Sequence, residues 1–454
     1  MVERNGKVVP ADAYYGINGV RFQETFAISG YKIHREFIIA MAMVKKAAAL
    51  ANMKAGVLEK SKAMAIAQAA DEVIEGKWHD HFVGEAIQGG AGTGINMVTN
   101  EVLANRAIEI LGHKPGEYEH VSPVDHVNKG QSTNDALPTG IRIAMIRMLQ
   151  GYIKANELLV NTIKEKAAEY KDCLKLGRTH LQDAVPMRVG DELAAWAEAF
   201  QRDVERGKLA CKLLAEVNMG ATAIGTGLNA DPRYRELVIE ELRAASGISD
   251  LKLAKNLIDA TQNLDVLVEV SGLLRAGAVS LIKVANDLRL MASGPMAGLA
   301  ELELPAMAAG SSIMAGKVNP IVPEVVNQVA FKVLGNDLTI MMVAQAGQFE
   351  LNVMEPVLAF AFFESISMLT AAINTLAEKT IKGMKYRTDR CQQYAESAMS
   401  LVTSLVPLIG YNKAAEVSKK AVATGKSIIE VVLEEKLLPE EQARELLDPR
   451  HMVG

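Results

Sequence analysis

Cysteine is scarce in this chain of 454 residues. Its three cysteines, Cys173, Cys211 and Cys391, lie far apart and form no CxxC pair. This spacing provides no disulfide framework, and it favours reduced, mostly buried thiols. The first six residues also lack the basic and then apolar run of a signal peptide. We therefore expect a cytoplasmic protein.

Long apolar runs and clusters of metal ligands are also missing. The longest apolar run, Val357 to Ile373, is interrupted by Glu364 and Ser365 and falls short of the roughly 20 residues that cross a bilayer. The eight histidines are dispersed, and only His79 and His81 lie close together in sequence. We expect no membrane span and no metal site.

A strong excess of one charge is absent too. The chain has 49 basic and 54 acidic side chains, a net charge of −5, and its lysines and arginines are scattered along the sequence. Such a distribution gives no electrostatic footprint for nucleic acid. The length and a hydrophobic content of 49% predict a large core in two or three domains or in one elongated unit.

Proline is absent from three long windows. They lie between Pro138 and Pro186, between Pro232 and Pro295, and between Pro356 and Pro407. The windows are rich in Ala, Leu, Lys and Glu, and an interior proline would cost a helix about 3 kcal/mol. The sequence therefore predicts an all-α protein with a central bundle of long helices.

The window after Asp259 is apolar on all sides of the predicted helix. One stripe advances by steps of four and three, and other apolar residues occupy the opposite side. A helix that is apolar all round must be surrounded by other helices, so this pattern indicates an oligomer. The stripe consists of Val266, Val270, Leu273, Gly277, Leu281, Val284 and Leu288, and the opposite side of Leu264, Leu267, Leu274, Val279 and Ile282.

Three segments rich in Gly, Ser, Thr and Asn interrupt the helices: Gln88–Asn100, Ser122–Thr139 and Ala292–Pro323. Their backbone N–H groups and hydroxyls can face a ligand, so they are the candidate functional loops. Short helices are expected from about Asp389 onwards. We predict an N-terminal helical domain over 1–132, a central bundle over 133–388 and a small C-terminal domain over 389–454.

The segment 310–320 combines small residues with two adjacent hydroxyls, an ammonium group and an amide. Such a loop can close over an anion, with Lys317 and Asn319 as donors to a carboxylate. A glycine-rich turn between two helices explains its composition equally well. A nucleotide site is excluded because neither GxxxxGK[ST] nor GxGxxG occurs.

Two other segments carry clustered polar residues. Ser132, Thr133 and Asn134 precede a predicted helix, where they can cap it, bind an anion, or do both; the segment ending at Thr93 has a similar composition. Residues 177–184 form a polar insert in helical surroundings. A lone histidine such as His180 is more often structural than catalytic.

Together these segments resemble the sequence blocks of one enzyme family. GSSIMAGKVNP is similar to the signature loop GSSxMPxKxNP of the aspartase/fumarase superfamily, and QGGAGTGINM, HVNKGQSTNDALPTG, GRTHLQDAVPM, GTGLN, SGPMAGLAELELP and GQFELNVMEPV resemble its other blocks in order. The resemblance extends from Pro10 to the C-terminal subdomain. STND and NVMEP resemble the aspartase branch, whereas fumarases usually show SSND and NVFKP.

This resemblance implies reversible elimination of ammonia from L-aspartate to give fumarate, through an aci-carboxylate intermediate and without a required cofactor. It implies that Ser311 is the base and that each active site of a homotetramer is built from three subunits. The implied contacts are Thr93, Ser132, Thr133 and Ser312 for the carboxylate that gains charge, Thr179, Lys317 and Asn319 for the other carboxylate, and Asn134 and His180 near the leaving amine.

Four positions depart from the family pattern. Met296 replaces an arginine, which is expected to leave Glu301 without a partner, and Ala315 replaces the proline of the signature loop. Gly94 and Val406 stand where serine and asparagine are usual. These changes leave other interpretations open: a lyase that releases a different amine from another amino acid or a betaine, a class II fumarase-type hydratase, or an inactive scaffold.

Overall fold

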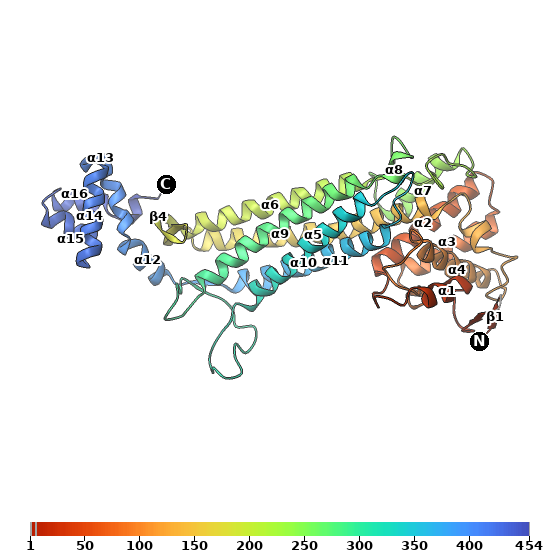
Figure 1. Ribbon diagram of the computed structural model, residues 1–454, viewed down its shortest axis with the longest axis horizontal. Coiled ribbons are helices and arrows are strands. Elements are labelled where there is room, and N and C mark those ends of the chain that lie inside the picture. The colour runs from red at the N-terminus through yellow and green to blue at the C-terminus, as the bar shows by residue number, and fades with distance from the viewer. Residues whose placement is uncertain (1, 5–6, 454) are drawn as a thin grey trace. The chain divides into compact units, whose positions relative to one another are not determined.

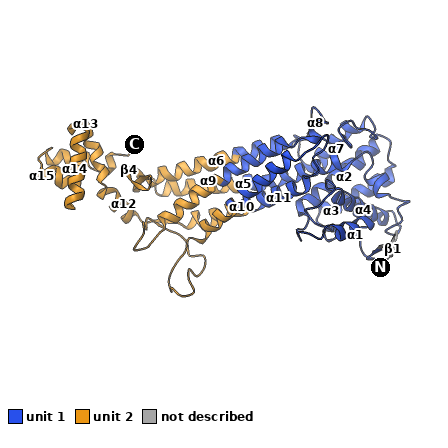
Figure 2. Ribbon diagram, viewed as in Figure 1, with its two compact units in different colours: residues 1–154, 205–278, 331–370 blue, residues 155–204, 279–330, 371–454 orange. Residues whose placement is uncertain are grey.

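The computed structural model describes residues 2–4 and 7–453. Residues 1, 5 and 6, which belong to the segment examined for a leader, lie outside this part. Most described residues are helical, and every sheet has only two strands (Figure 1), so the predicted all-α class is confirmed. The chain divides into two compact units, residues 1–154, 205–278 and 331–370 and residues 155–204, 279–330 and 371–454 (Figure 2).

Unit 1 contains the N-terminal helices and parts of the long helices. Its core forms around α2 (Arg35–Lys54), which packs against α3 (Lys60–Ile74) and α7 (Tyr234–Ser246). Many of the buried residues of α2 are alanines, and such small side chains let neighbouring helices approach closely. The other elements include β1 (Val2–Arg4), β2 (Lys7–Val9), α1 (Ile17–Thr25), the 3-10 helix η1 (His79–His81), α4 (Thr93–Ile110), the π-helix η2 (Pro123–Val127), β5 (Glu216–Val217), β6 (Lys252–Leu253) and α8 (Asp259–Gln262).

Five long helices contribute residues to both units: α5 (Thr133–Glu169), α6 (Val189–Leu214), α9 (Asp265–Met291), α10 (Ile321–Gln345) and α11 (Glu355–Lys379). Three of them, α5, α9 and α11, lie mainly in the proline-poor windows. Pro138 lies inside α5 and lacks the N–H that would pair with the Asn134 carbonyl. Asn218 Nδ2 donates to that carbonyl instead, at 2.9 Å.

Unit 2 carries the hairpin of β3 (Leu174–Thr179) and β4 (Gln182–Arg188) and the C-terminal helices. A separate apolar cluster, which includes Leu405, Val417 and Val431, holds the last segment together. The strands and α-helices of unit 2 also include β7 (Leu302–Glu303), β8 (Lys385–Tyr386), α12 (Thr388–Ser397), α13 (Val406–Ile409), α14 (Tyr411–Thr424), α15 (Ile428–Glu434) and α16 (Glu440–Leu446). The boundaries of the three predicted domains remain a prediction.

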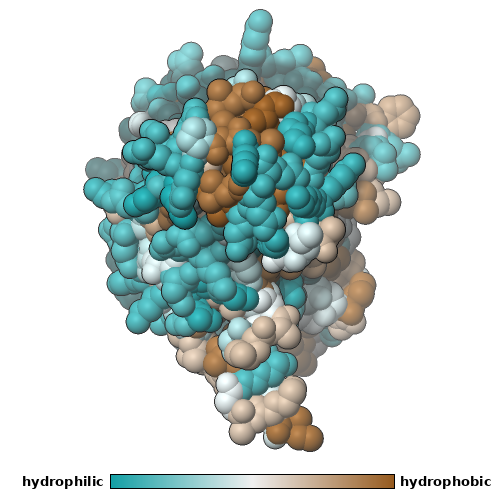
Figure 3. Space-filling view, turned by 90° about the vertical axis from the view of Figure 1, so that its left-hand side faces the viewer, coloured by the Kyte–Doolittle hydropathy of each residue, from teal (hydrophilic) through white to brown (hydrophobic). Residues whose placement is uncertain are grey.

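The surface of the C-terminal segment is mostly hydrophilic, with a confined apolar area (Figure 3). Leu408 and Val422 of the C-terminal segment are more than half exposed. The segment Glu355–Gly383 is long and apolar enough to cross a membrane by length and composition, contrary to the sequence estimate. However, 61% of its most apolar window is buried inside the protein, as expected for a core helix.

Candidate functional site

The N-terminus of α4 presents the first candidate residue. Thr93 is exposed at the first position of the helix, directly after Gly92 in the left-handed conformation (φ 78°). A Cβ on Gly92 would lie 2.5 Å from the Leu137 side chain, so the small residue lets α4 approach α5. Gly94 likewise leaves room for the Phe22 ring, which gives this departure from the family pattern a packing explanation.

The N-terminus of α5 presents Ser132, Thr133 and Asn134. Ser132 Oγ accepts the N–H of Asn134 at 3.2 Å, so it caps the helix. The N–H of Ser132 donates to Asp135 Oδ1 at 2.9 Å. Asp135 also accepts the N–H groups of Gly220 and Thr222. Burial raises the pKa of this carboxyl to about 6, although these N–H groups oppose the shift.

A buried lysine supports this end of α5 from α2. Lys45 is fully buried, and its Nζ donates to Asn128 Oδ1 and Gln131 Oε1, at 2.9 Å each. Burial lowers the pKa of Lys45 to about 7, while Asp135 opposes that change. Asn96 Nδ2 bridges Asn128 Oδ1 and Thr133 Oγ1, at 3.2 and 3.1 Å. The ends of α4 and α5 therefore share one hydrogen-bonded network.

The polar insert predicted at residues 177–184 is the turn of the β3–β4 hairpin. His180 and Leu181 form its two-residue connection, and both have positive φ angles, 58° and 59°. This conformation is uncommon for residues other than glycine and is frequent at functional sites. The side chains of Thr179 and His180 are exposed, so they can contact a ligand or another chain.

An ion pair anchors this hairpin, and it corrects one expectation from the sequence. Arg178 NH1 and NH2 donate to Glu301 at 2.9 and 3.0 Å, and Glu301 is fully buried. Glu301 therefore has a partner although Met296 replaces the usual arginine. Met296 itself is 90% exposed. The expectation was wrong because a residue distant in sequence supplies the guanidinium group.

The signature loop of unit 2 is largely exposed. Ser311 Oγ accepts the N–H groups of Ile313 and Met314 at 3.2 and 2.9 Å. At the base of the loop, Asn319 Nδ2 donates to the Gly310 carbonyl at 2.6 Å. A Cβ at Gly310 would collide with the backbone of Lys317, so glycine permits this close approach.

A cavity of about 910 Å³ adjoins this loop within unit 2. Its lining includes Lys317 and Asn319 together with Arg289, Arg387 and Glu303. Three cationic side chains and one carboxylate therefore line the same space. The excess of positive charge suits an anionic ligand.

The ten predicted residues fall into two sets. Unit 1 brings Thr93 into the same part of the fold as Ser132, Thr133 and Asn134. Unit 2 contains the other six, Thr179, His180, Ser311, Ser312, Lys317 and Asn319. Asn134 Nδ2 is engaged with the Ala223 carbonyl at 2.7 Å, so this amide holds a loop of its own unit.

Sequence reasoning missed several supporting residues. The burial of Lys45 could have been predicted from the sequence. A lysine within the apolar run of α2 indicates a buried charge that needs hydrogen-bond partners. The structure also groups His113, Glu117 and His120, contrary to the expectation that the histidines form no ligand cluster. Three residues separate His113 from Glu117, and two separate Glu117 from His120. This loop lies outside the three segments that the sequence analysis selected as candidate functional loops.

Known proteins match this chain over nearly its whole length. Residues 6–335 match the family model described as Lyase, and residues 401–454 match Fumarase C C-terminus. The chain is 50% identical to an aspartate ammonia-lyase from Bacillus sp over 98% of this chain and 95% of the relative, and 49% identical to that of Escherichia coli K12 over 98% and 94%. The solved structure of a fumarate lyase:delta crystallin from Brucella melitensis bound to cobalt superposes with a TM-score of 0.95 at 44% identity, covering 98% and 96% of the two chains. A class II fumarase from Schistosoma mansoni gives a TM-score of 0.93 at 34% identity over the same shares.

Proposed function

This chain belongs to the aspartase/fumarase superfamily, and from that premise we propose that it is an aspartate ammonia-lyase. It converts L-aspartate reversibly to fumarate and ammonia. The observation that carries this proposal is the identity of 46–50% to aspartate ammonia-lyases over 98% of the chain. The class II fumarase is only 34% identical, which favours ammonia over water as the leaving group.

The proposed reaction begins with loss of a proton from C3 of L-aspartate. The proton moves to Ser311 Oγ, and the electron pair of the broken C–H bond passes into the adjacent carboxylate to give an aci-carboxylate. The electrons then return to form the C2–C3 double bond, and the C–N bond breaks with its electron pair on nitrogen. Donors placed where the extra charge develops lower the barrier, so no cofactor is required in this proposal.

We assign the two carboxylates to different donor sets. Thr93, Ser132, Thr133 and Ser312 are proposed to hold the carboxylate that gains charge, and Thr179, Lys317 and Asn319 the other. Asn134 and His180 are proposed to lie near the amine. The N-termini of α4 and α5 support the first set because free N–H groups and the helix dipole favour an anion.

Ser311 is the proposed base, although a serine hydroxyl is normally a poor one. Its oxygen already accepts the N–H groups of Ile313 and Met314. These donors supply the stabilisation that a deprotonated serine needs, and their effect grows when a closed loop excludes water. This geometry supports the assignment of Ser311.

We further infer a homotetramer in which three chains complete each site. The support comes from the unit 1 part of α10, where Phe331, Leu338, Met341 and Met342 expose between 46% and 57% of their surface. Their spacing places them along an apolar stripe. Water-exposed apolar area of this kind marks an association surface, which packing with copies of the same helix would bury.

The direct test measures fumarate formation by ultraviolet absorbance with purified protein and L-aspartate, beside L-malate. We expect rapid formation from L-aspartate and none from L-malate. Formation from L-malate alone would identify a fumarase-type hydratase. Silence with both substrates from a tetrameric protein would reject the proposal, and other amino acids and betaines would then be examined.

A further inference from the structure

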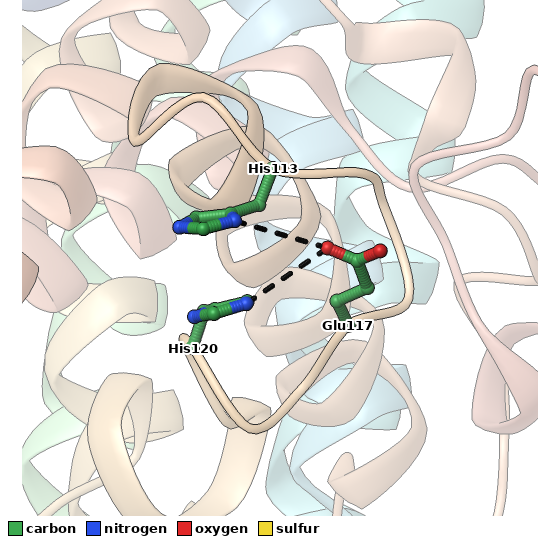
Figure 4. A group of neighbouring side chains, drawn as sticks. All are labelled: His113, Glu117 and His120. Carbon is green, nitrogen blue, oxygen red and sulfur yellow. Dashed lines mark ion pairs between the residues drawn. The ribbon is translucent and has the colours of Figure 1, made fainter.

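Two histidines and a glutamate meet on the loop that follows α4. His113 and His120 lie with their rings stacked, with centroids 3.5 Å apart and planes inclined by 10°. Glu117 reaches toward both rings from the same loop (Figure 4). None of the three residues takes part in the proposed elimination, so their arrangement needs a separate explanation.

The spacing of the donor atoms approaches that of a metal site. Glu117 Oε2 lies 4.0 Å from His113 Nδ1 and 3.9 Å from His120 Nε2. All the potential ligand atoms fall within 4.8 Å of one another. Bonds of about 2.0–2.2 Å to a tetrahedral ion place ligand atoms roughly 3.3–3.6 Å apart. Contraction by about half an ångström would therefore bring Glu117 Oε2 and each nitrogen to the separation of a bound set.

The backbone prearranges this cluster, while the side chains keep room to adjust. His113 follows Gly112 at the end of α4, and its N–H donates to the Ile108 carbonyl at 3.0 Å. The N–H of His120 donates to the Glu117 carbonyl at 3.0 Å. The side chains remain 41%, 40% and 36% exposed for His113, Glu117 and His120, respectively. An ion in the plane of both imidazoles requires the two stacked rings to turn apart, and the exposure of these side chains leaves room for that rotation.

Further hydrogen bonds orient the carboxylate and fix the loop. The N–H of Lys114 donates to Glu117 Oε2 at 3.1 Å. The N–H of Gly116 donates to Asn105 Oδ1 at 2.7 Å and joins the loop to α4. Hydrogen bonds to a ligating carboxylate are a usual feature of metal sites because they orient the ligand. A simple surface ion pair would need neither the second ring nor this support.

We propose that His113, Glu117 and His120 bind one divalent transition-metal ion of the Zn²⁺ type. Two imidazoles and one carboxylate match the ligand preference of Zn²⁺, whereas Mg²⁺ and Ca²⁺ prefer oxygen ligands. The exposed side of the cluster leaves the remaining coordination positions to water. The ion joins the end of α4 to the turn at His120 and stabilises this loop, and it takes no part in the elimination.

The test is isothermal titration of Zn²⁺ into the full-length, tag-free protein after removal of metals. We expect one saturable site per chain in this region, with binding at least about tenfold weaker after His113→Ala or His120→Ala. Glu117→Ala should weaken binding as well. His451→Ala is the matched control, because His451 is exposed on the C-terminal segment and should leave the affinity unchanged.

A second measurement keeps the proposal testable if an alanine variant folds poorly. His113→Gln and His120→Gln retain polar side chains, and circular dichroism verifies their fold. X-ray absorption of the Zn²⁺-loaded wild type should show imidazole scattering that decreases in both variants. Absence of saturable Zn²⁺ binding, or unchanged affinity in the folded His113→Gln/His120→Gln double variant, would overturn the proposal.

Discussion

The N-termini of α4 and α5 in unit 1 and the signature loop of unit 2 differ in how firmly the surrounding structure fixes their polar side chains. Ser132 and Thr133 belong to a hydrogen-bonded network. This network includes two fully buried side chains, the lysine Lys45 and the carboxyl of Asp135. The loop from Ser311 to Val318 instead lies open to water, with Ile313 87% exposed. Only a few hydrogen bonds shape it.

This difference suits two tasks in one reaction. A site that stabilises developing charge works best when its donors are fixed in advance, because no reorganisation is then required at the moment of reaction. A base that must be shielded from water works best on a segment that can close after substrate binds. We therefore expect changes in the network to alter stability, and changes in the loop to alter rate.

The largest effect is expected from Ser311→Ala. Removing the proposed base should lower kcat by about 10²–10⁴-fold while the protein remains folded, because Ser311 lies on the loop. The measurement is the rate of fumarate formation, together with circular dichroism. Ile313→Ala on the same loop is the control and should change the rate little. A folded Ser311→Ala protein with substantial activity would show that another group removes the proton.

Lys45→Met and Lys317→Met sharpen the contrast between buried and exposed lysines. The first removes the donor to Asn128 and Gln131 and should lower the free energy of unfolding by about 1–3 kcal/mol. The second changes an exposed side chain and should alter stability by less than about 0.5 kcal/mol while raising KM for L-aspartate. Thermal unfolding and steady-state kinetics measure both effects. If Lys45→Met and Lys317→Met lowered the free energy of unfolding equally, the contrast between a fixed buried network and an exposed loop would be contradicted.

The buried carboxyl of Glu355 should make the stability of unit 1 depend on pH. Burial raises its pKa to about 8, and Arg142 opposes this shift. Because the folded state holds this proton more tightly than the unfolded state, the contribution is complete below about pH 4.5 and is lost as pH rises toward 8. We expect Glu355→Gln to remove a slope of at most about 1.4 kcal/mol per pH unit over this range. Denaturant unfolding at several pH values tests this, and an unchanged slope would contradict it.

The smallest effect is expected from Ala315→Pro, which restores the usual residue of the signature loop. Proline restricts the unfolded and open states, so at a compatible position it should stabilise by about 0.4–1 kcal/mol. Limited proteolysis at the loop should become slower while the rest of the chain is unaffected. Faster cleavage would show that the backbone at Ala315 does not accommodate proline.

The sequence was informative where one physical rule dominated. Proline-poor windows predicted most of α5, α9 and α11, because an interior proline disrupts a helix. The same rule did not predict that α5 includes Pro138. The proline is tolerated because the Asn218 amide donates to the Asn134 carbonyl, which proline leaves without a backbone donor. The β3–β4 hairpin was also missed. Its turn uses His180 and Leu181 at positive φ, whereas sequence rules for such turns look for asparagine or glycine.

The candidate residues of the site were easier to find in the sequence than the residues that hold them in place. Ser132, Thr133, Ser311 and Lys317 belong to contiguous motifs that the sequence displays directly. The partners of Glu301 and Asp135 come from distant segments, so only the fold can pair them. The same is true of Asn96, which bridges α4 and α5 through its amide. The catalytic role predicted for Ser311 and the binding role predicted for Lys317 are tested by the variants above.

Hydrogen–deuterium exchange with mass spectrometry tests the contrast most directly. We predict that amides of residues 311–318 exchange rapidly in the free protein and become protected in an equilibrium mixture of L-aspartate, fumarate and ammonium. Amides at the start of α5, after Thr133, should be protected under both conditions. A loop that is equally protected without ligand, or a helix end that becomes ordered only with ligand, would contradict the division into a fixed anion site and a closing base loop.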